Sequence, residues 1–418
     1  YSIIFAGDFN QCEPVGMIDK EKLWHPFSSR HFENNINCCI ILDGLHRFKD
    51  DEEYGLILQK LCSGDMTQAD VDRINERVVG TGGVALPRNL EGDTCYACSK
   101  NSQRNAITAA IFREHLRQTH PEADSAEEPP GHTVIIKGLI EPSISSDRRI
   151  GSVMRRRIVQ LGDNDMRQDT TLVSPHLCCY NGAYFMCNSN DELKEQGIGN
   201  GTQCRLIRVK LREDQTSYKC EVWDGRKVWT VCASDVEFVE FEHYPIRNGV
   251  AKSFKLMPKR FYVAVKVLPH DIATETITMK CRVTQLPLNA SDAITGHKLQ
   301  GLTKDNVIVK GWNKSVKWIY TVLSRVRTLA GLFIFEKLQL RDIKPPSREY
   351  LDFLERMKKK ENEDLERAMR IWRSGPPNGA GNGHGDAGKL VDRFQHRPRR
   401  LRPYHGRLSL LPGSEAGH

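Results

Sequence analysis

Two short polar clusters contain the residues of this chain that are best suited to chemistry. Each precedes an apolar run; the first comprises Thr295, His297, Lys298, Gln300 and Gly301, and the second Ser324, Arg325 and Arg327. The apolar runs that follow, at 307–309 and 332–335, predict two buried parallel strands. Pairing of these strands would bring both clusters to one edge of a sheet. A cation-rich edge beside a glycine turn suits the binding of phosphate oxygens.

Length, charge and hydropathy limit the number of domains and the kinds of partner that this chain can have. The chain has 418 residues, enough for two or three domains with cores of their own. Its 61 Lys and Arg against 53 Asp and Glu give a net charge of +8, a mild bias toward anionic partners such as nucleic acid. No apolar run approaches membrane-spanning length, so we expect a soluble protein without membrane association.

The cysteines indicate a reducing compartment. The 13 cysteines are irregularly spaced and no secretory segment is present, so we expect free thiols and an intracellular location, nuclear if the organism is eukaryotic. Cys95-x-x-Cys98 has metal-type spacing, but no second pair lies at the distance of a zinc ribbon or finger. We therefore predict no metal site in this chain.

Two further polar groups occur early in the chain. An apolar strand expected at 2–6 ends at Gly7-Asp8-Phe9-Asn10-Gln11, and a second strand expected at 39–42 precedes Arg47. A strand that ends in Asp is compatible with a magnesium-binding strand of a nucleotide site. Helices are expected at 53–61 and 67–78. A loop rich in glycine follows from residue 79 to residue 93, where the chain could hinge.

The motifs together resemble those of superfamily-one DNA helicases of the RecD-like and PIF-type (petite integration frequency) branch. Thr295-x-His297-Lys298-x-Gln300-Gly301 resembles motif five, Leu323-Ser324-Arg325 resembles motif six, and Gly7-Asp8-x-x-Gln11 resembles motif three. The sequence departs from the usual residues at Cys12 and Glu13, at Gly296 and Leu299, and at Thr321 and Val322. These departures spare the charged positions.

The resemblance implies a fold and an activity. The fold would be α/β, with RecA-like motor domains built on parallel sheets and a small β-barrel inserted in the second. The activity would be ATP hydrolysis with Mg²⁺, coupled to 5′-to-3′ movement on single-stranded DNA, with duplex or forked DNA as a further partner. Such enzymes act in DNA repair, recombination and replication.

The resemblance also implies roles for particular residues. Arg325, Arg47 and Gln11 would act at the γ-phosphate, and Gln300, Gly301 and Asp8 would help to bind the nucleotide. Thr295, His297, Lys298 and Asn101 would contact DNA; the last follows a strand expected at 94–99, where related helicases carry a Thr-Asn pair. Tyr218, Trp223 and Trp229 are open to two interpretations, base stacking or packing in the barrel core.

The expected organisation has six parts. They are the end of the first motor domain (1–82), the start of the second (83–196), a barrel insertion (197–245), the rest of the second motor domain (246–343), an amphipathic helix (344–373) and a disordered basic tail (374–418). Asn200-Gly201 is a strong hairpin signal. Strands are expected at 203–212, 218–223, 227–233, 236–241, 261–268 and 277–286.

The sequence contains no phosphate loop that we accept. Residues 383–389 have the glycine and lysine spacing, but Leu390 replaces the Ser or Thr that would bind magnesium, and no strand precedes them. We expect that the chain begins inside the first motor domain, after the phosphate loop and the magnesium ligands, and that residues 1–418 alone lack ATPase activity. The alternative is a degenerate, non-catalytic nucleic-acid-binding protein; a cellular, viral or mobile-element origin stays open.

Overall fold

A computed structural model describes most of the chain. The described residues are 6–12, 38–42, 44–80, 82–87, 94–118, 133–143, 156, 158, 174, 176–188, 197–213, 217–223, 225–243, 252–267, 275 and 277–373. Three predicted segments lie mostly or wholly outside these residues. They are the strand expected at 2–6, the rejected phosphate-loop sequence at 383–389 and the basic tail.

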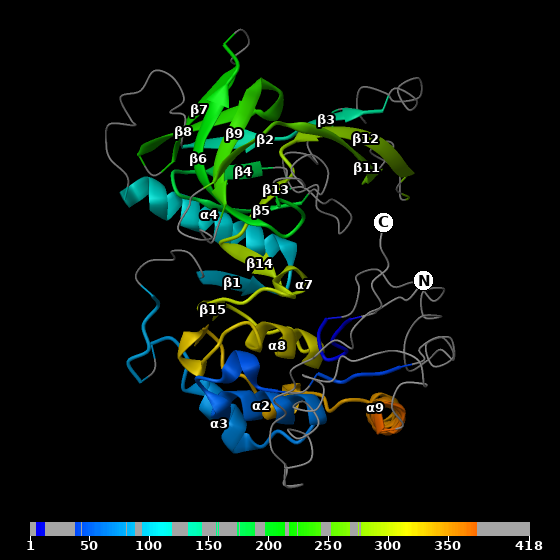
Figure 1. Cartoon of the computed structure of the whole chain (residues 1–418). Helices are drawn as coiled ribbons and strands as arrows, with labels where there is room; N and C mark the ends of the chain where they lie inside the picture. The colour runs from blue at the N-terminus through cyan, green and yellow to red at the C-terminus, as the bar shows by residue number, and fades with distance from the viewer. Residues whose placement is uncertain are drawn as a thin grey trace.

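Four short parallel strands form the sheet that positions the two polar clusters (Figure 1). They are β14 (Ala293–Thr295), β1 (Thr94–Cys98), β15 (Asn306–Val309) and β16 (Leu332–Ile334), in that order across the sheet. All three pairings are parallel. After Asn306, β15 and β16 are apolar without interruption because neither presents a face to solvent. The two predicted parallel strands and their pairing are therefore confirmed, as is the α/β class.

Two helices, α2 (Glu52–Ser63) and α3 (Gln68–Asn75), share one apolar core with this sheet. Local sequence sets their ends. The Asp51 side chain caps the first turn of α2, and Gly64 ends that helix in the left-handed conformation at φ 85°. Thr67 and Asp70 form a reciprocal capping box at the start of α3. Both predicted helices are confirmed; the predicted domain boundaries stay predictions.

A β-rich region follows in the upper half of Figure 1 and contains two sheets. One has the order β10-β9-β6-β5-β13, and the other β4-β2-β8-β7. Their strands are β2 (Val134–Lys137), β4 (His176–Cys179), β5 (Tyr184–Cys187), β6 (Gln203–Leu211), β7 (Tyr218–Trp223), β8 (Arg226–Cys232), β9 (Val236–His243), β10 (Ser253–Leu256) and β13 (Leu288–Ala290).

The four strands expected for the barrel are all present, but the barrel itself is not confirmed. β6 and β9 lie in one sheet and β7 and β8 in the other, and no described strand of one sheet pairs with the other. Apolar side chains from both sheets form one core, and Trp229 is part of it at 4% exposed. For Trp229, the structure therefore favours packing in the core over base stacking.

One helix lies between these regions, and a third sheet projects to one side. Helix α4 (Asn101–Gln118) lies between the parallel sheet and the β-rich region, where Phe112 is buried against Ile135 and Val228 (Figure 1). A three-stranded sheet, in the order β11 (Lys259–Val267), β12 (Ile277–Gln285) and β3 (Leu139–Pro142), extends from the β-rich region toward the upper right of Figure 1. The strands predicted at 261–268 and 277–286 are thus confirmed.

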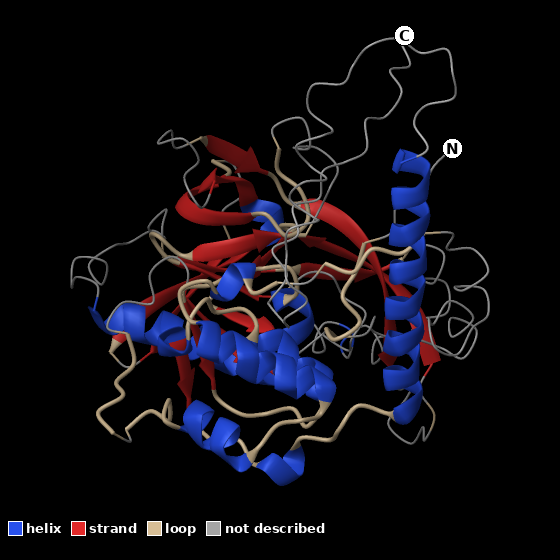
Figure 2. Cartoon of the chain, turned by 60° about the horizontal axis from the view of Figure 1, so that its bottom comes forward, coloured by secondary structure: helices blue, strands red, loops and turns tan. Residues whose placement is uncertain are grey.

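The long helix α9 (Arg348–Arg373) lies along one side of the chain, as Figure 2 shows, and confirms the predicted amphipathic helix. The strand predicted at 39–42 is wrong, because these residues have no strand partner. The backbone N–H groups of Cys39 and Ile41 donate instead to Asp364 (2.9 Å) and Glu361 (2.7 Å) of α9. A short apolar run does not reveal whether its backbone N–H groups will bond a neighbouring strand or the carboxylates of a helix.

All 13 cysteines are free. None of the described helices is both long enough and apolar enough to span a membrane.

Asp292, just before β14, is a buried carboxyl with an altered acidity. It is 7% exposed, and its Oδ2 accepts a hydrogen bond from the Tyr180 hydroxyl at 3.3 Å. Burial raises the pKa of Asp292 to about 6, despite the opposing effects of Tyr180 and Lys304.

Asp292→Asn should stabilise the fold at neutral pH. The folded-state pKa of about 6 lies above the ordinary 3.8, so the stability that the neutral carboxyl contributes is complete below 3.8 and is lost as pH rises through 6. Thermal unfolding should give the variant a gain of up to about 3 kcal/mol at about pH 7.5, shrinking to nothing by about pH 4. A gain that does not depend on pH would contradict this account.

Asp70→Asn is the control with the opposite sign. Desolvation raises the pKa of Asp70, but the hydrogen bonds from Lys60 and Thr67 together lower it below 3.8. The Asp70 carboxylate therefore contributes stability above 3.8, which the variant should lack at neutral pH.

Candidate functional site

Arg325 lies at the amino ends of β15 and β16 and is 1% exposed. Its guanidinium donates through Nε to the Thr321 carbonyl (2.8 Å), through Nη1 to the Leu302 carbonyl (3.1 Å) and through Nη2 to Ser324 Oγ (2.7 Å). Its own carbonyl accepts the Lys304 N–H at 2.8 Å. One side chain thereby ties helix α8 (Val316–Leu323) to the loop that precedes β15.

Arg47 reaches the same point from the short helix η2 (His46–Phe48). Its Nη1 donates to the Ser324 carbonyl at 2.6 Å, and its side chain is half-buried. Burial and, next, the neighbouring Arg47 lower the pKa of Arg325 to about 10. Arg325 is still a cation at neutral pH, so an anion placed between the two guanidiniums would offset their repulsion. The two arginines that the sequence singled out do lie together.

The turn from Asp8 to Cys12 is bonded to the same structure. Within the turn, the Gln11 side-chain amide donates to Asp8 Oδ2 at 2.8 Å. The Cys12 N–H donates to Thr321 Oγ1 at 2.9 Å, and the Cys12 carbonyl accepts from Gln300 Nε2 at 3.3 Å. Motifs three, five and six therefore meet in one hydrogen-bonded network.

Thr321 is a site residue that sequence reasoning missed. It stood out only as a departure from the usual motif-six sequence, yet its hydroxyl accepts from Cys12 and donates to the Lys317 carbonyl at 2.6 Å. Its partner is 309 positions away in the sequence, so no local pattern could have indicated the contact.

The first polar cluster is divided between two ends of the sheet. Thr295 pairs with Cys98 at the carboxyl end of β1, whereas Leu302, two residues after Gln300, accepts from Arg325 at the amino ends. The one-turn helix α7 (Gly296–Leu299) and Gly301, at φ 84°, make the connection. The expectation that His297 and Lys298 share an edge with Arg325 therefore needs correction, because both belong to α7, next to the carboxyl end.

Basic and polar groups gather at that carboxyl end. Asn101 begins α4 directly after β1, and the pKa of Lys298 is lowered by burial and by the nearby cation of Arg104. Arg104 is a second residue that the sequence did not single out. The four predicted DNA contacts, Thr295, His297, Lys298 and Asn101, thus lie on two adjacent strand ends.

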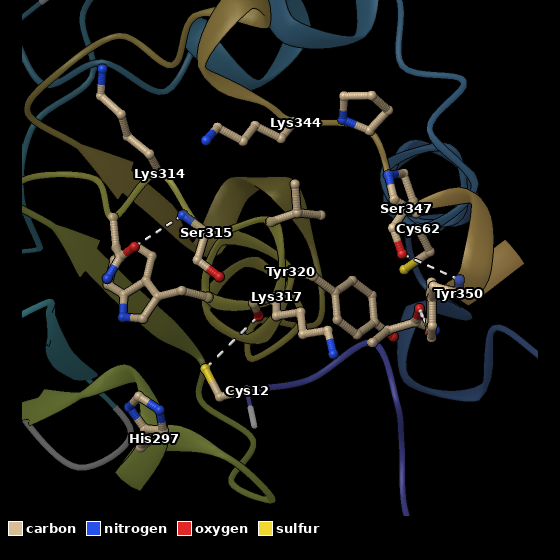
Figure 3. A pocket seen from close by; sticks show the side chains of 16 residues that line it. Cys12, Cys62, His297, Lys314, Ser315, Lys317, Tyr320, Lys344, Ser347 and Tyr350 are labelled. Atoms are coloured by element: carbon tan, nitrogen blue, oxygen red, sulfur yellow. Dashed lines mark hydrogen bonds between the residues drawn. The ribbon is translucent and has the colours of Figure 1, made fainter. Parts of the chain in front are cut away.

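A groove of about 560 Å³ opens beside His297 and the Cys12 turn. Three lysines line it, Lys314, Lys317 and Lys344, together with Tyr320 and the residues that begin α9 (Figure 3). Lys314 is 73% exposed, although it also pairs with Asp342. Cations around an open groove suit a chain of phosphates.

The described residues do not fit a magnesium site. No group of three His, Cys, Asp or Glu side chains among them could hold a metal ion. The Asp8 carboxylate, which could serve as one ligand, accepts from the Asn10 N–H and from the Gln11 side chain.

The fold matches solved structures of Pif1 helicases. The Bacteroides enzyme in complex with ADP-AlF3 and ssDNA superposes with a TM-score of 0.53 and 17% identity over 84% of this chain and 66% of that chain. The Candida albicans enzyme gives 0.54 and 16% over 84% and 67%. A structure of Pif1 helicases described at forked dsDNA gives 0.52 and 18% over 85% and 65%.

This chain therefore has the RecA-like fold of the Pif1 helicases, and it spans about two thirds of their length. No protein-family model and no curated protein matches its sequence.

Thr321→Val should free the turn at Cys12. The change removes the acceptor of a buried N–H at nearly constant volume, which costs about 1 kcal/mol or more. Hydrogen exchange of the Cys12 amide should become about tenfold faster, whereas Thr321→Ser, which keeps the hydroxyl, should exchange like the native chain. Unchanged exchange in the valine variant would show that this hydrogen bond does not hold the turn.

Gly296→Ile should be poorly tolerated, although isoleucine is the usual motif-five residue. A Cβ at Gly296 would lie 2.2 Å from Nε1 of Trp318, which is itself 2% exposed. We expect a loss of about 3 kcal/mol in unfolding free energy. Combined with Trp318→Ala, the loss should be at least about 1 kcal/mol smaller than the sum of the single changes.

Gly311→Ala is the matched control, because a Cβ there meets nothing closer than 3.7 Å. If the losses in unfolding free energy were additive in the double variant, contact with Trp318 would not be the reason that residue 296 must be glycine.

Proposed function

We propose that this chain is part of an ATP-dependent DNA helicase, which couples ATP hydrolysis to 5′-to-3′ movement on single-stranded DNA. The observation that carries the proposal is one hydrogen-bonded network. Arg47 and Arg325 both donate to Ser324, and Gln300 donates to the Cys12 carbonyl of the Asp8–Cys12 turn. Two adjacent guanidiniums are costly to bury unless an anion joins them. The Pif1 fold supports the same conclusion.

The proposed task of the two arginines is to stabilise negative charge on the γ-phosphate. An arginine at that position contributes roughly 10³ to 10⁵ in rate in related phosphoryl-transfer enzymes. Three N–H groups of Arg325 are engaged with Thr321, Leu302 and Ser324, so two others remain for a ligand. Arg47, which is half-buried, is the more accessible partner.

The proposed coupling to DNA runs through Gln300 and α7. Gln300 contacts the Cys12 carbonyl, and the four residues of α7 separate it from Thr295. Thr295, His297, Lys298 and Asn101 would contact the phosphates of the strand, and the lysine-lined groove beside His297 would continue its path. Closure around the nucleotide would then shift the DNA-binding end of the sheet.

Magnesium would accompany ATP and neutralise charge on its phosphates, with ligands that we expect outside this chain.

Arg47→Ala in the full-length protein should reduce ATP turnover by roughly 10³-fold or more while binding of single-stranded DNA changes little. Arg325→Lys, which keeps a buried cation, should give a similar loss and avoids the unpaired carbonyls that alanine would leave. Arg327→Ala is the control, because Arg327 is 57% exposed and only weakly paired with Asp305.

Normal turnover in both the Arg47 and Arg325 variants would refute the assignment. Residues 1–418 alone should not hydrolyse ATP. DNA binding without turnover in the full-length protein would favour the alternative, a degenerate nucleic-acid-binding protein.

A further inference from the structure

The sheet β11-β12-β3 has one buried face and one exposed face. Met279, Cys281 and Val283 of β12 are buried with Ile140 and Ile158 in a small core. The residues that alternate with them point the other way. On the described part of that outer face, they include Arg260, Tyr262, Lys280 and Arg282.

The outer face combines cations with one prominent aromatic ring. Tyr262 is 64% exposed and lies directly opposite Arg282 in the antiparallel register. The Lys280 ammonium stands 4.9 Å from the centre of the Tyr262 ring. Arg260 lies two positions from Tyr262 on the same strand, which places its Cα about 7 Å away.

The charges on this face are unbalanced. Glu141 of β3 accepts from Arg282 through Nε (3.2 Å) and Nη2 (2.9 Å), which fixes that guanidinium beside the ring. Within the described part of the chain, no carboxylate forms an ion pair with Lys280 or Arg260. Two cations and an exposed ring therefore remain for a partner that is both anionic and aromatic.

We propose that this face binds single-stranded DNA, with a base stacked on Tyr262 and the flanking phosphates held by Lys280 and Arg260. A tyrosine ring with adjacent cations is the combination that binds unpaired nucleotides. An acidic peptide would use the cations and leave the ring unused, and duplex DNA would offer no free base to stack. The inference rests on the proposed function and adds a contact outside the parallel sheet.

The location suits an auxiliary contact. In Figure 1 the sheet β11-β12-β3 lies at the upper right, above and to one side of β1 and β15. Its strand β12 leads through β13 and β14 to Thr295, and Gln285 at its end is fully buried. Gln285 Nε2 donates to the carbonyls of Ile136 (3.4 Å) and Ser174 (3.1 Å), so the sheet is fixed to the β-rich region.

Fluorescence anisotropy of residues 1–418 with labelled oligothymidylate tests the proposal. Tyr262→Ala should weaken binding about tenfold, whereas Tyr262→Phe, which keeps the ring, should bind like the native chain. Lys280→Ala should also reduce the slope of log K against log salt by about 0.7. Lys219→Ala on β7, where the lysine is 75% exposed, is the charge-matched control and should change neither quantity.

A second measurement does not depend on affinity. An oligonucleotide that contains 5-bromouracil should crosslink to Tyr262 on irradiation, and mass spectrometry of the peptides locates the adduct. Crosslinks confined to α4 and α7 would overturn the proposal.

Lys298→Ala separates this inference from the proposed function. If it weakens binding while Tyr262→Ala does not, the auxiliary surface is refuted and the helicase proposal stands. If no DNA binding is detected at all, both fail. Tyr262-dependent binding of polyglutamate that exceeds binding of the oligonucleotide would also overturn the inference.

Discussion

The buried charge of Arg325 is the constraint on which the site depends. A guanidinium removed from water is tolerated only when its N–H groups find acceptors, and here these are the Thr321 and Leu302 carbonyls and Ser324 Oγ. The acceptors come from the α8 segment and from the loop before β15. Neither segment can move without breaking hydrogen bonds of the Arg325 guanidinium. The arrangement of motifs five and six is thus fixed by one side chain.

The same network extends to distant parts of the chain. The Cys12 backbone joins it through Thr321 and Gln300, and Arg47 joins it through the Ser324 carbonyl. Helix α9 supports the turn from the outside, where the Tyr350 hydroxyl donates to Asn10 Oδ1 at 2.5 Å. A change in the contacts of the two arginines would therefore alter the turn, α7 and the carboxyl end of the sheet.

Sequence reasoning succeeded where the deciding interactions are local or strongly patterned. The runs at 307–309 and 332–335 are apolar without interruption and form the neighbouring strands β15 and β16, and the spacing of α9 predicted a helix. It failed at residues 39–42, whose partners are carboxylates of α9. It also missed Thr321 and the dependence of Gly296 on Trp318, because both reflect packing between segments that are adjacent only after folding. The barrel strands were found, but their division between two sheets depends on long-range pairing.

The most direct test is hydrogen exchange of the proposed full-length helicase with and without ADP and aluminium fluoride. The account predicts that residues 8–12, 300–304 and 321–327 become protected together, because a γ-phosphate mimic bound by Arg47 and Arg325 would stabilise their shared network. Binding of the nucleotide with no change in these three segments would contradict it.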